Sequence, residues 1–269
     1  MRIFFIGDIV GKPGVEIVQQ VVPVLRRNES IDIVIANGEN AESGSGITPS
    51  IYRKLKDAEV DCITLGDHAF RKRDIIDTLD SKTDILRPAN FPTEAPGQGF
   101  TIIKTGTGTK VAVINLIGRV FMKPADCPFH AADQILSQIP DDVPVRFVDF
   151  HAEATSDKQL MGHHLDGRVS AMIGTHTHVP TADEHIKQGG TAFLCDVGMT
   201  GPHDSILGRS KECVFETTYS FRPRTFHVAK KDSRISGVLI DVDRKTGKAQ
   251  SIRRLTIDEK QADLLEDMD

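Results

Sequence analysis

The sequence has few cysteines, and none of them are paired at short spacing. Its 269 residues include four cysteines, with no C-x-x-C arrangement. This argues against a disulfide framework and a structural zinc site, and it suits a reducing cytosol. No stretch reaches the ~18 consecutive apolar residues of a membrane span. The N-terminus meets Asp8 too early for the apolar region of a signal peptide. We therefore expect a cytoplasmic protein without a membrane segment.

The sequence also lacks an excess of positive charge. Its formal net charge is −5, and no basic stripe is visible. Stable DNA binding is therefore not expected, because proteins that hold the phosphate backbone normally present clustered lysine and arginine. An acidic protein can still bind a phosphate group where metal ions supply the positive charge. No run of Ser, Pro or Gly forms a linker, so we expect one domain over residues 1–257 and an acidic, solvated tail over 258–269.

The sequence does contain a series of short apolar runs that end in polar residues. Runs of this kind predict strands that are buried on both faces. They span residues 2–6, 31–36, 62–65, 145–150 and 169–173. Helices are predicted between and beside them, over residues 15–26, 49–58, 73–79, 131–139 and 156–164. The alternation predicts an α/β fold with a largely parallel centre.

Local signals refine this prediction. Pro23 is expected to kink the first helix or end it early, because proline removes a backbone donor. Thr48 is a suitable N-cap for the second helix. Two pairs of strands, 100–104 with 110–116 and 237–243 with 249–255, flank short turns and are predicted as hairpins. A parallel centre with added antiparallel strands predicts an α/β fold of two mixed β-sheets, packed as a sandwich with flanking helices.

Acidic and histidine side chains follow several predicted strands within one or two residues. In open α/β sheets, ligands bind beyond the carboxyl ends of the strands. Singly, such residues have simpler explanations, such as a turn residue, a helix cap or a buried histidine with a hydrogen bond. Together, they would be costly to bury without cations. The residues are Asp8, Glu39, Asp67, His151, His176 and His178.

The donor types narrow the choice of metal. Oxygen and nitrogen ligands without thiolate suit Mn, Fe or Zn rather than a soft metal or an iron–sulfur cluster. The number of candidate ligands exceeds the four that a tetrahedral zinc ion needs. The sequence therefore predicts a centre with two metal ions at one edge of the sheets.

Seven motifs occur in order between positions 7 and 201. In this combination, the sequence resembles the calcineurin-like metallophosphoesterases and, among them, the YmdB-like bacterial phosphodiesterases. The resemblance implies the calcineurin-like metallophosphoesterase fold and a metal-dependent phosphoric diester hydrolase. The motifs are GDIVG (7–11), NGENA (37–41), GDH (66–68), RPANFP (87–92), DFHAE (149–153), GTHTH (174–178) and DVGMTG (196–201).

The resemblance also implies a role for each candidate residue. One metal would be held by Asp8 and His178, and the other by Asp67, His151 and His176. Glu39 would bridge the two metals, and Asn40 would lie in or beside the coordination shell. His68 would contact the leaving group as the catalytic acid. The family usually has Gly-Asn-His where this chain has Gly66-Asp67-His68. A carboxylate here replaces the usual amide ligand, which changes the charge of the site.

The implied reaction is in-line attack on phosphorus by a hydroxide that bridges the two metals. The substrates would be small nucleotide phosphodiesters, especially 2′,3′-cyclic or 3′,5′-cyclic nucleotides. Fe or Mn would be the main metals, with Zn or Mg as alternatives, and a homo-oligomer is an expectation from the family alone. Two other functions stay open, namely a phosphomonoesterase such as a 5′-nucleotidase and a metal-binding regulatory protein with little catalysis. The sequence assigns no substrate-binding residue.

Overall fold

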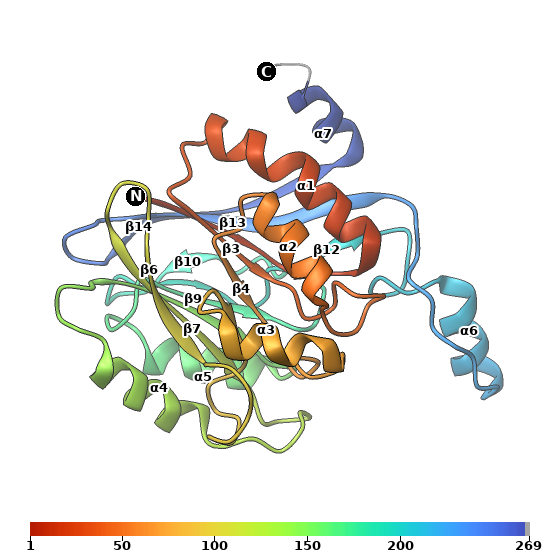
Figure 1. Ribbon diagram of the computed structural model, residues 1–269, viewed down its shortest axis with the longest axis horizontal. Coiled ribbons are helices and arrows are strands. Elements are labelled where there is room, and N and C mark those ends of the chain that lie inside the picture. The colour runs from red at the N-terminus through yellow and green to blue at the C-terminus, as the bar shows by residue number, and fades with distance from the viewer. Residues whose placement is uncertain (267–269) are drawn as a thin grey trace.

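The strands of the chain assemble into two sheets that face each other, with helices on both outer faces (Figure 1). The computed structural model describes residues 1–266. Both sheets mix parallel and antiparallel strands. The fold class predicted from the sequence, two mixed sheets with flanking helices, is confirmed.

The first sheet has the strand order β2-β12-β13-β1-β3-β4-β5, and β14 pairs with β13. Its half from β1 to β5 is parallel, whereas β13 runs antiparallel to β1, β12 and β14. The strands are β1 (Arg2–Ile6), β2 (Asp8–Ile9), β3 (Ile33–Asn37), β4 (Cys62–Thr64), β5 (Ile85–Leu86), β12 (Met199–Pro202), β13 (Ser233–Val242) and β14 (Ala249–Asp258).

The second sheet has the order β10-β11-β9-β8-β7-β6. Its four central strands are parallel, and an antiparallel strand closes each edge. The strands are β6 (Phe100–Lys104), β7 (Lys110–Ile117), β8 (Val145–His151), β9 (Ala171–Thr175), β10 (His185–Ile186) and β11 (Ala192–Leu194). The two predicted hairpins, β6–β7 and β13–β14, are both present.

Helices cover the outer faces of the two sheets (Figure 1). In chain order, the described helices are α1 (Gly11–Asn28), α2 (Pro49–Asp57), a 3-10 turn η1 (Arg73–Ile75) that leads into α3 (Ile76–Ser81), α4 (Pro128–Gln138), α5 (Thr155–His164), α6 (Lys211–Ser220) and α7 (Glu259–Glu266). The side chain of Thr48 caps α2 as predicted, since its oxygen accepts a hydrogen bond from the amide of Ile51. Helix α1 does not end at Pro23 but continues to Asn28.

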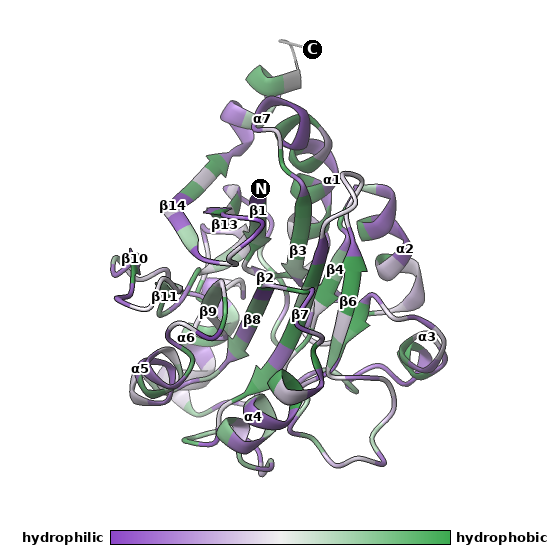
Figure 2. Cartoon of the chain, turned by 90° about the vertical axis from the view of Figure 1, so that its left-hand side faces the viewer, coloured by the Kyte–Doolittle hydropathy of each residue, from purple (hydrophilic) through white to green (hydrophobic). Residues whose placement is uncertain are grey.

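Strand β1 shows why the strands lack a polar face. Phe4 and Ile6 pack against the helices, whereas Ile3 and Phe5 face the second sheet. The ring of Phe5 meets the ring of Phe147 with centroids 4.9 Å apart. A strand between a helix layer and another sheet must be apolar on both sides. The central strands are accordingly hydrophobic, and edge strand β14 is more hydrophilic (Figure 2).

The last described residues differ from the expected solvated tail. Helix α7 packs against α1, with Ala262 buried and the amide of Gln20 donating to Asp263. The remainder of the expected tail, residues 267–269, lies outside the described residues. By contrast, α6 has no buried residue and projects from the body of the molecule (Figure 1). None of the described helices is long and apolar enough to cross a bilayer.

Candidate metal centre

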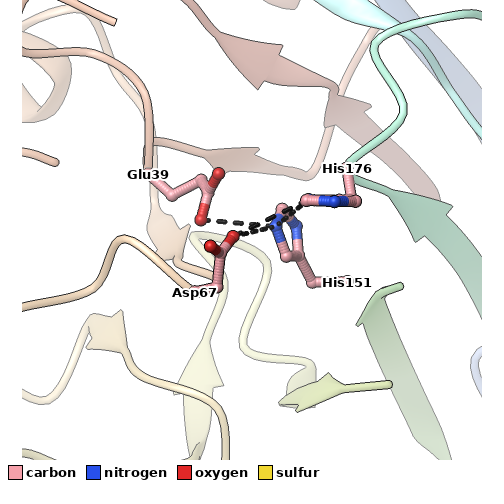
Figure 3. A group of neighbouring side chains, drawn as sticks. All are labelled: Glu39, Asp67, His151 and His176. Carbon is pink, nitrogen blue, oxygen red and sulfur yellow. Dashed lines mark hydrogen bonds and ion pairs between the residues drawn. The ribbon is translucent and has the colours of Figure 1, made fainter. Parts of the chain in front are cut away.

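Strands from both sheets bring four potential ligands together at one end of the sandwich. Glu39 and Asp67 follow β3 and β4 of the first sheet, while His151 ends β8 and His176 follows β9 of the second. One ligand atom from each of these residues lies within 4.8 Å of the others (Figure 3). The carboxyl ends of parallel strands therefore meet here as predicted.

Distances within this cluster match those between ligands of one metal ion. The Nε2 atom of His151 lies 3.3 Å from Oε2 of Glu39, 3.4 Å from Oδ1 of Asp67 and 3.0 Å from Nδ1 of His176. Ligand atoms about 2.1 Å from a tetrahedral or octahedral ion would be separated by about 3.0–3.4 Å. The spacing therefore fits a cation at the centre of the group.

Asp8, Asn40 and His178 adjoin this cluster. The Nδ2 atom of Asn40 donates to Oε1 of Glu39 at 2.8 Å and lies 3.1 Å from Nε2 of His178. That Nε2 is 3.9 Å from Oδ1 of Asp8. Asp8 begins β2, which pairs with β12, and its Oδ2 accepts a hydrogen bond from the amide of His176. The structure thus brings all the predicted ligands into one region.

Two carboxylate oxygens test whether these residues fit metal ions. Oδ1 of Asp8 and Oδ1 of Asp67 are buried and have no hydrogen-bond partner. A buried carboxylate oxygen without a partner is costly, and coordination to a cation would offset this cost. Oxygen and imidazole donors without thiolate also suit borderline and hard cations. The residues present therefore fit the implied metals, and Asp67 is placed as a ligand would be.

The buried charges shift the protonation of several groups. Burial raises the pKa of Asp8, although the positive charges of His178 and His151 act in the opposite direction. Burial also acts to raise the pKa of Glu39, but His151 and His68 together outweigh it and hold the pKa of that carboxyl well below its usual range. Burial, aided by the charge of His151, lowers the pKa of His176 to about 4. His176 is therefore neutral at pH 7, as a metal ligand must be.

His68 lies beside this cluster and remains partly accessible. Its backbone amide donates to Oε2 of Glu39 at 3.0 Å, and its Nδ1 lies 2.9 Å from Oδ1 of Asn40. An amide oxygen only accepts, so Nδ1 is the donor in this contact and Nε2 is left for another partner. Nδ1 of His68 also lies 3.3 Å from Oε1 of Glu39. The hydrogen bond between these side chains raises the pKa of His68 and so favours its protonated form.

Comparison with known proteins identifies the family. A model of the YmdB-like protein family matches residues 4–255. The chain belongs to the YmdB-like family. The match covers nearly the whole chain and includes all the residues of the candidate centre.

Relatives of this YmdB-like protein support the same conclusion. A 2′,3′-cyclic-nucleotide 2′-phosphodiesterase of Bacillus subtilis (strain 168) is 46% identical over 259 residues, which is 96% of this chain and 98% of the relative. Two solved structures cover 96% of the chain. One is a hypothetical protein from Thermus thermophilus (TM-score 0.91, 38% identity, 100% of that chain). The other is a novel phosphatase from Mycoplasma pneumoniae (TM-score 0.89, 33% identity, 93% of that chain). The expected class, a hydrolytic phosphoesterase, is confirmed.

Behind the ligands of the YmdB-like protein lies a buried carboxylate that the sequence did not reveal. Asp149 accepts hydrogen bonds from Nδ2 of Asn37 at 2.9 Å, Oγ1 of Thr64 at 2.6 Å and Oγ1 of Thr175 at 2.7 Å. Its donors are all neutral, and burial raises its pKa to about 6. Asp149 stands within the DFHAE motif, which is the one sequence signal that points to it.

This network fixes the ring of His151. The hydroxyl of Thr175 has a single proton, which it donates to Asp149, so it can only accept from Nδ1 of His151 at 2.9 Å. Nδ1 of His151 therefore carries a proton, and Nε2 is the ring nitrogen whose lone pair a bound metal ion would use. Indirect support of this kind orients metal-bound histidines and raises their basicity.

A second buried carboxylate, Asp196, supports the turn that carries His176 and His178. Its Oδ2 accepts from Nζ of Lys158 at 2.6 Å and from both the amide and the hydroxyl of Thr177, at 3.1 and 2.7 Å. Its Oδ1 accepts from the amide of Gly198. Lys158 and Asp196 are fully buried. The sequence predicts the helix that bears Lys158, but nothing in it distinguishes this lysine from a surface one.

Proposed function

We propose that the chain is a dinuclear-metal phosphodiesterase that hydrolyses small nucleotide phosphodiesters, with 2′,3′-cyclic or 3′,5′-cyclic nucleotides as substrates. The observation that carries the proposal is the convergence of the carboxylate and imidazole ligands, in which the buried Oδ1 atoms of Asp8 and Asp67 have no hydrogen-bond partner. The activity named for the Bacillus subtilis relative supports the choice of substrate.

Glu39 supports a bridged pair of ions. Its Oε2 lies 3.3 Å from Nε2 of His151, and its Oε1 accepts a hydrogen bond from Nδ2 of Asn40. We assign one ion to the side of Asp67, His151 and His176 and the other to the side of Asp8, Asn40 and His178. As a ligand, Asn40 would present Oδ1 in place of Nδ2, and Nδ2 would then donate to Nδ1 of His68. The ions, foremost Fe or Mn with Zn or Mg as alternatives, would polarise the phosphate and supply a hydroxide.

His68 is the proposed general acid for the leaving oxygen. Its Nδ1 is held by Asn40, so Nε2 can carry the proton that the leaving oxygen takes. General acids of this kind contribute about 10²–10⁴-fold. In His68→Ala, we expect bound metal to stay and the rate to fall selectively on nucleotide diesters, because an activated aryl diester needs no acid. Equal losses on both substrates, or loss of metal, would show a different role.

A substrate panel tests the function as a whole. The purified protein, analysed for metal content, is assayed on 2′,3′-cyclic AMP, 3′,5′-cyclic AMP and adenosine 5′-monophosphate. Faster turnover of a cyclic diester supports the proposal. Faster turnover of the monophosphate would favour a phosphomonoesterase. This alternative is retained because the similar Mycoplasma pneumoniae protein is called a phosphatase. Bound metal without turnover would indicate a regulatory protein.

A variant of Glu39 tests the metal centre directly. In Glu39→Ala, both proposed ions lose a shared ligand, so we expect a folded protein with less bound metal and almost no hydrolysis. Circular dichroism checks the fold, and elemental analysis checks the metal. Glu94→Ala, at an exposed carboxylate, is the control. Full activity in a metal-depleted Glu39 variant would contradict a two-metal mechanism.

We also infer a cytoplasmic location and a homo-oligomer. All four cysteines are free thiols, as expected in a reducing compartment. Two exposed aromatic side chains on α6, Phe215 and Tyr219, stack on each other, and patches of this kind often mark contacts between proteins. Light scattering of the purified protein would measure the assembly. A net charge of −5 argues against stable DNA binding.

A further inference from the structure

The segment that follows β7 begins and ends on residues of the metal centre. Ile117, the last residue of β7, pairs with His151 in the sheet. The amide of the next residue, Gly118, donates to the carbonyl oxygen of His151 at 3.0 Å. Five residues later, Nζ of Lys123 donates to the carbonyl oxygen of Asp67 at 3.0 Å. Residues 119–123, here called the 119–123 loop, therefore lie beside the candidate metal centre.

The 119–123 loop is held in a fixed shape. One oxygen of Asp157, in the first turn of α5, accepts hydrogen bonds from the amides of Arg119 at 3.0 Å and Val120 at 3.1 Å. The amide of Met122 closes a turn on the carbonyl of Arg119. With Lys123 anchored as well, the loop presents its remaining side chains in a defined position.

Phe121 is placed in a way that packing does not explain. Its side chain is 88% exposed, and its backbone has a φ of 61°, a left-handed conformation that bulky residues seldom adopt. Exposure of a phenyl ring and this conformation both cost free energy in the unliganded protein. The Cα atoms of Phe121 and Lys123 lie within about 7 Å of each other. An exposed aromatic ring on a loop whose backbone is fixed beside the site suits stacking on a planar ligand.

Lys123 brings positive charge to an acidic site. It is the only lysine or arginine that contacts Glu39, Asp67, His151 or His176 in the part of the chain that the structure describes. Its side chain is 60% exposed, and its ammonium has three donors, of which the carbonyl of Asp67 takes one. The other two can meet the oxygens of an incoming phosphate.

We propose that the 119–123 loop is the nucleotide-binding loop of the enzyme. Phe121 stacks on the base, and Lys123 pairs with an oxygen of the phosphate that would lie at the metal centre. This inference rests on the proposed function and adds the part of the chain that selects nucleotides over other phosphates. Stacking on an aromatic side chain tolerates any base, so purine and pyrimidine nucleotides both fit.

Binding to the metal-loaded protein tests this division of roles. Calorimetry measures the affinities of two probes, adenosine 3′-monophosphate and inorganic phosphate. Phe121→Ala should weaken nucleotide binding about tenfold and leave phosphate binding unchanged, because only the nucleotide has a base. Lys123→Met should weaken both probes by a similar factor of about ten, because both carry the phosphate. Metal content should stay the same in both variants.

Matched controls separate the loop from general surface effects. Phe221 is equally exposed, at 90%, with a φ of 55°, but lies at the end of α6. Lys245 is exposed in the β13–β14 turn, at the opposite end of the first sheet from the metal centre. Phe221→Ala and Lys245→Met should leave both affinities unchanged.

Any one of the following results would overturn the proposal: nucleotide binding no tighter than phosphate binding in the wild type, equal effects of Phe121→Ala on both probes, or the same loss in Phe221→Ala. Unchanged nucleotide affinity in Phe121→Ala would also overturn it, and would point to a protein ligand for the ring. These outcomes concern affinity alone. Turnover of cyclic nucleotides by the wild type decides the proposed function separately, so either one can fail without the other.

Discussion

Two buried carboxylates support the histidines of the metal centre, and the fold balances their charge in different ways. Asp149 is surrounded by the neutral donors of Asn37, Thr64 and Thr175, and it acts on His151 through one hydroxyl. Asp196 is paired with a buried ammonium and acts on the backbone of a turn. The first network sets the direction of a ligand's lone pair, whereas the second fixes the path of the chain.

The largest effect is expected at the ion pair. Lys158→Met leaves the carboxylate of Asp196 buried without its cation, which should lower the free energy of unfolding by about 3–5 kcal/mol. Urea denaturation of the metal-free protein measures this. Adding Asp196→Asn to Lys158→Met removes the unpaired charge and should recover part of the loss. A loss below about 1 kcal/mol in the single variant would mean that water reaches Asp196.

A smaller effect on stability, with a specific effect on metal, is expected at Thr175. Thr175→Val keeps the shape but removes the hydroxyl between Asp149 and His151. We expect a loss of about 1–3 kcal/mol, because a buried carboxylate oxygen and an imidazole N–H lose their partner. Metal affinity should fall about 10–100-fold. Competition with a chelator measures the affinity. Unchanged affinity would show that the hydroxyl does not orient His151.

The smallest effect is expected at Thr177, two residues along the same motif. Its hydroxyl also donates to a carboxylate, but Asp196 keeps Lys158 and the amide of Thr177 as partners. Thr177→Val should therefore cost no more than about 1 kcal/mol. Metal affinity should not change, because this hydroxyl contacts no ligand ring. If Thr177→Val lost as much metal affinity as Thr175→Val, the two networks would not differ in their effect on the metal.

The sequence predicts the ligands of the site better than the groups that hold them. Asp8, Glu39 and His151 could be found because each follows an apolar run, and parallel strands place their carboxyl ends at one edge. The partner of Lys158 could not be found, because a helical position gives no sign that a lysine is buried against a loop 38 residues away. For Asp149, the place within a strand gives no sign of its role, and its membership of the DFHAE motif is the one signal.

The same limits apply to the fold. Strands β2, β10 and β12 have two to four residues, which is too short for a hydrophobic period to appear. Helix α6 buries nothing, so it has no apolar stripe to detect. The acidic composition after residue 258 suggested solvent exposure. However, Ala262 and Leu265 pack α7 against the core, and Gln20 of α1 donates to Asp263.

The position of β1 in the first sheet has a consequence for the order of folding. β1 is flanked by β3 on one side and by β13 on the other, and β2, which begins with Asp8, pairs with β12. The ligand nearest the N-terminus is thus positioned by residues near 199 and by a strand that ends at Val242. Contacts this distant in sequence form slowly. During synthesis, a nascent chain would therefore expose every candidate metal ligand before β13 has emerged. That strand is needed to complete the sheet beside Asp8, the first of these ligands.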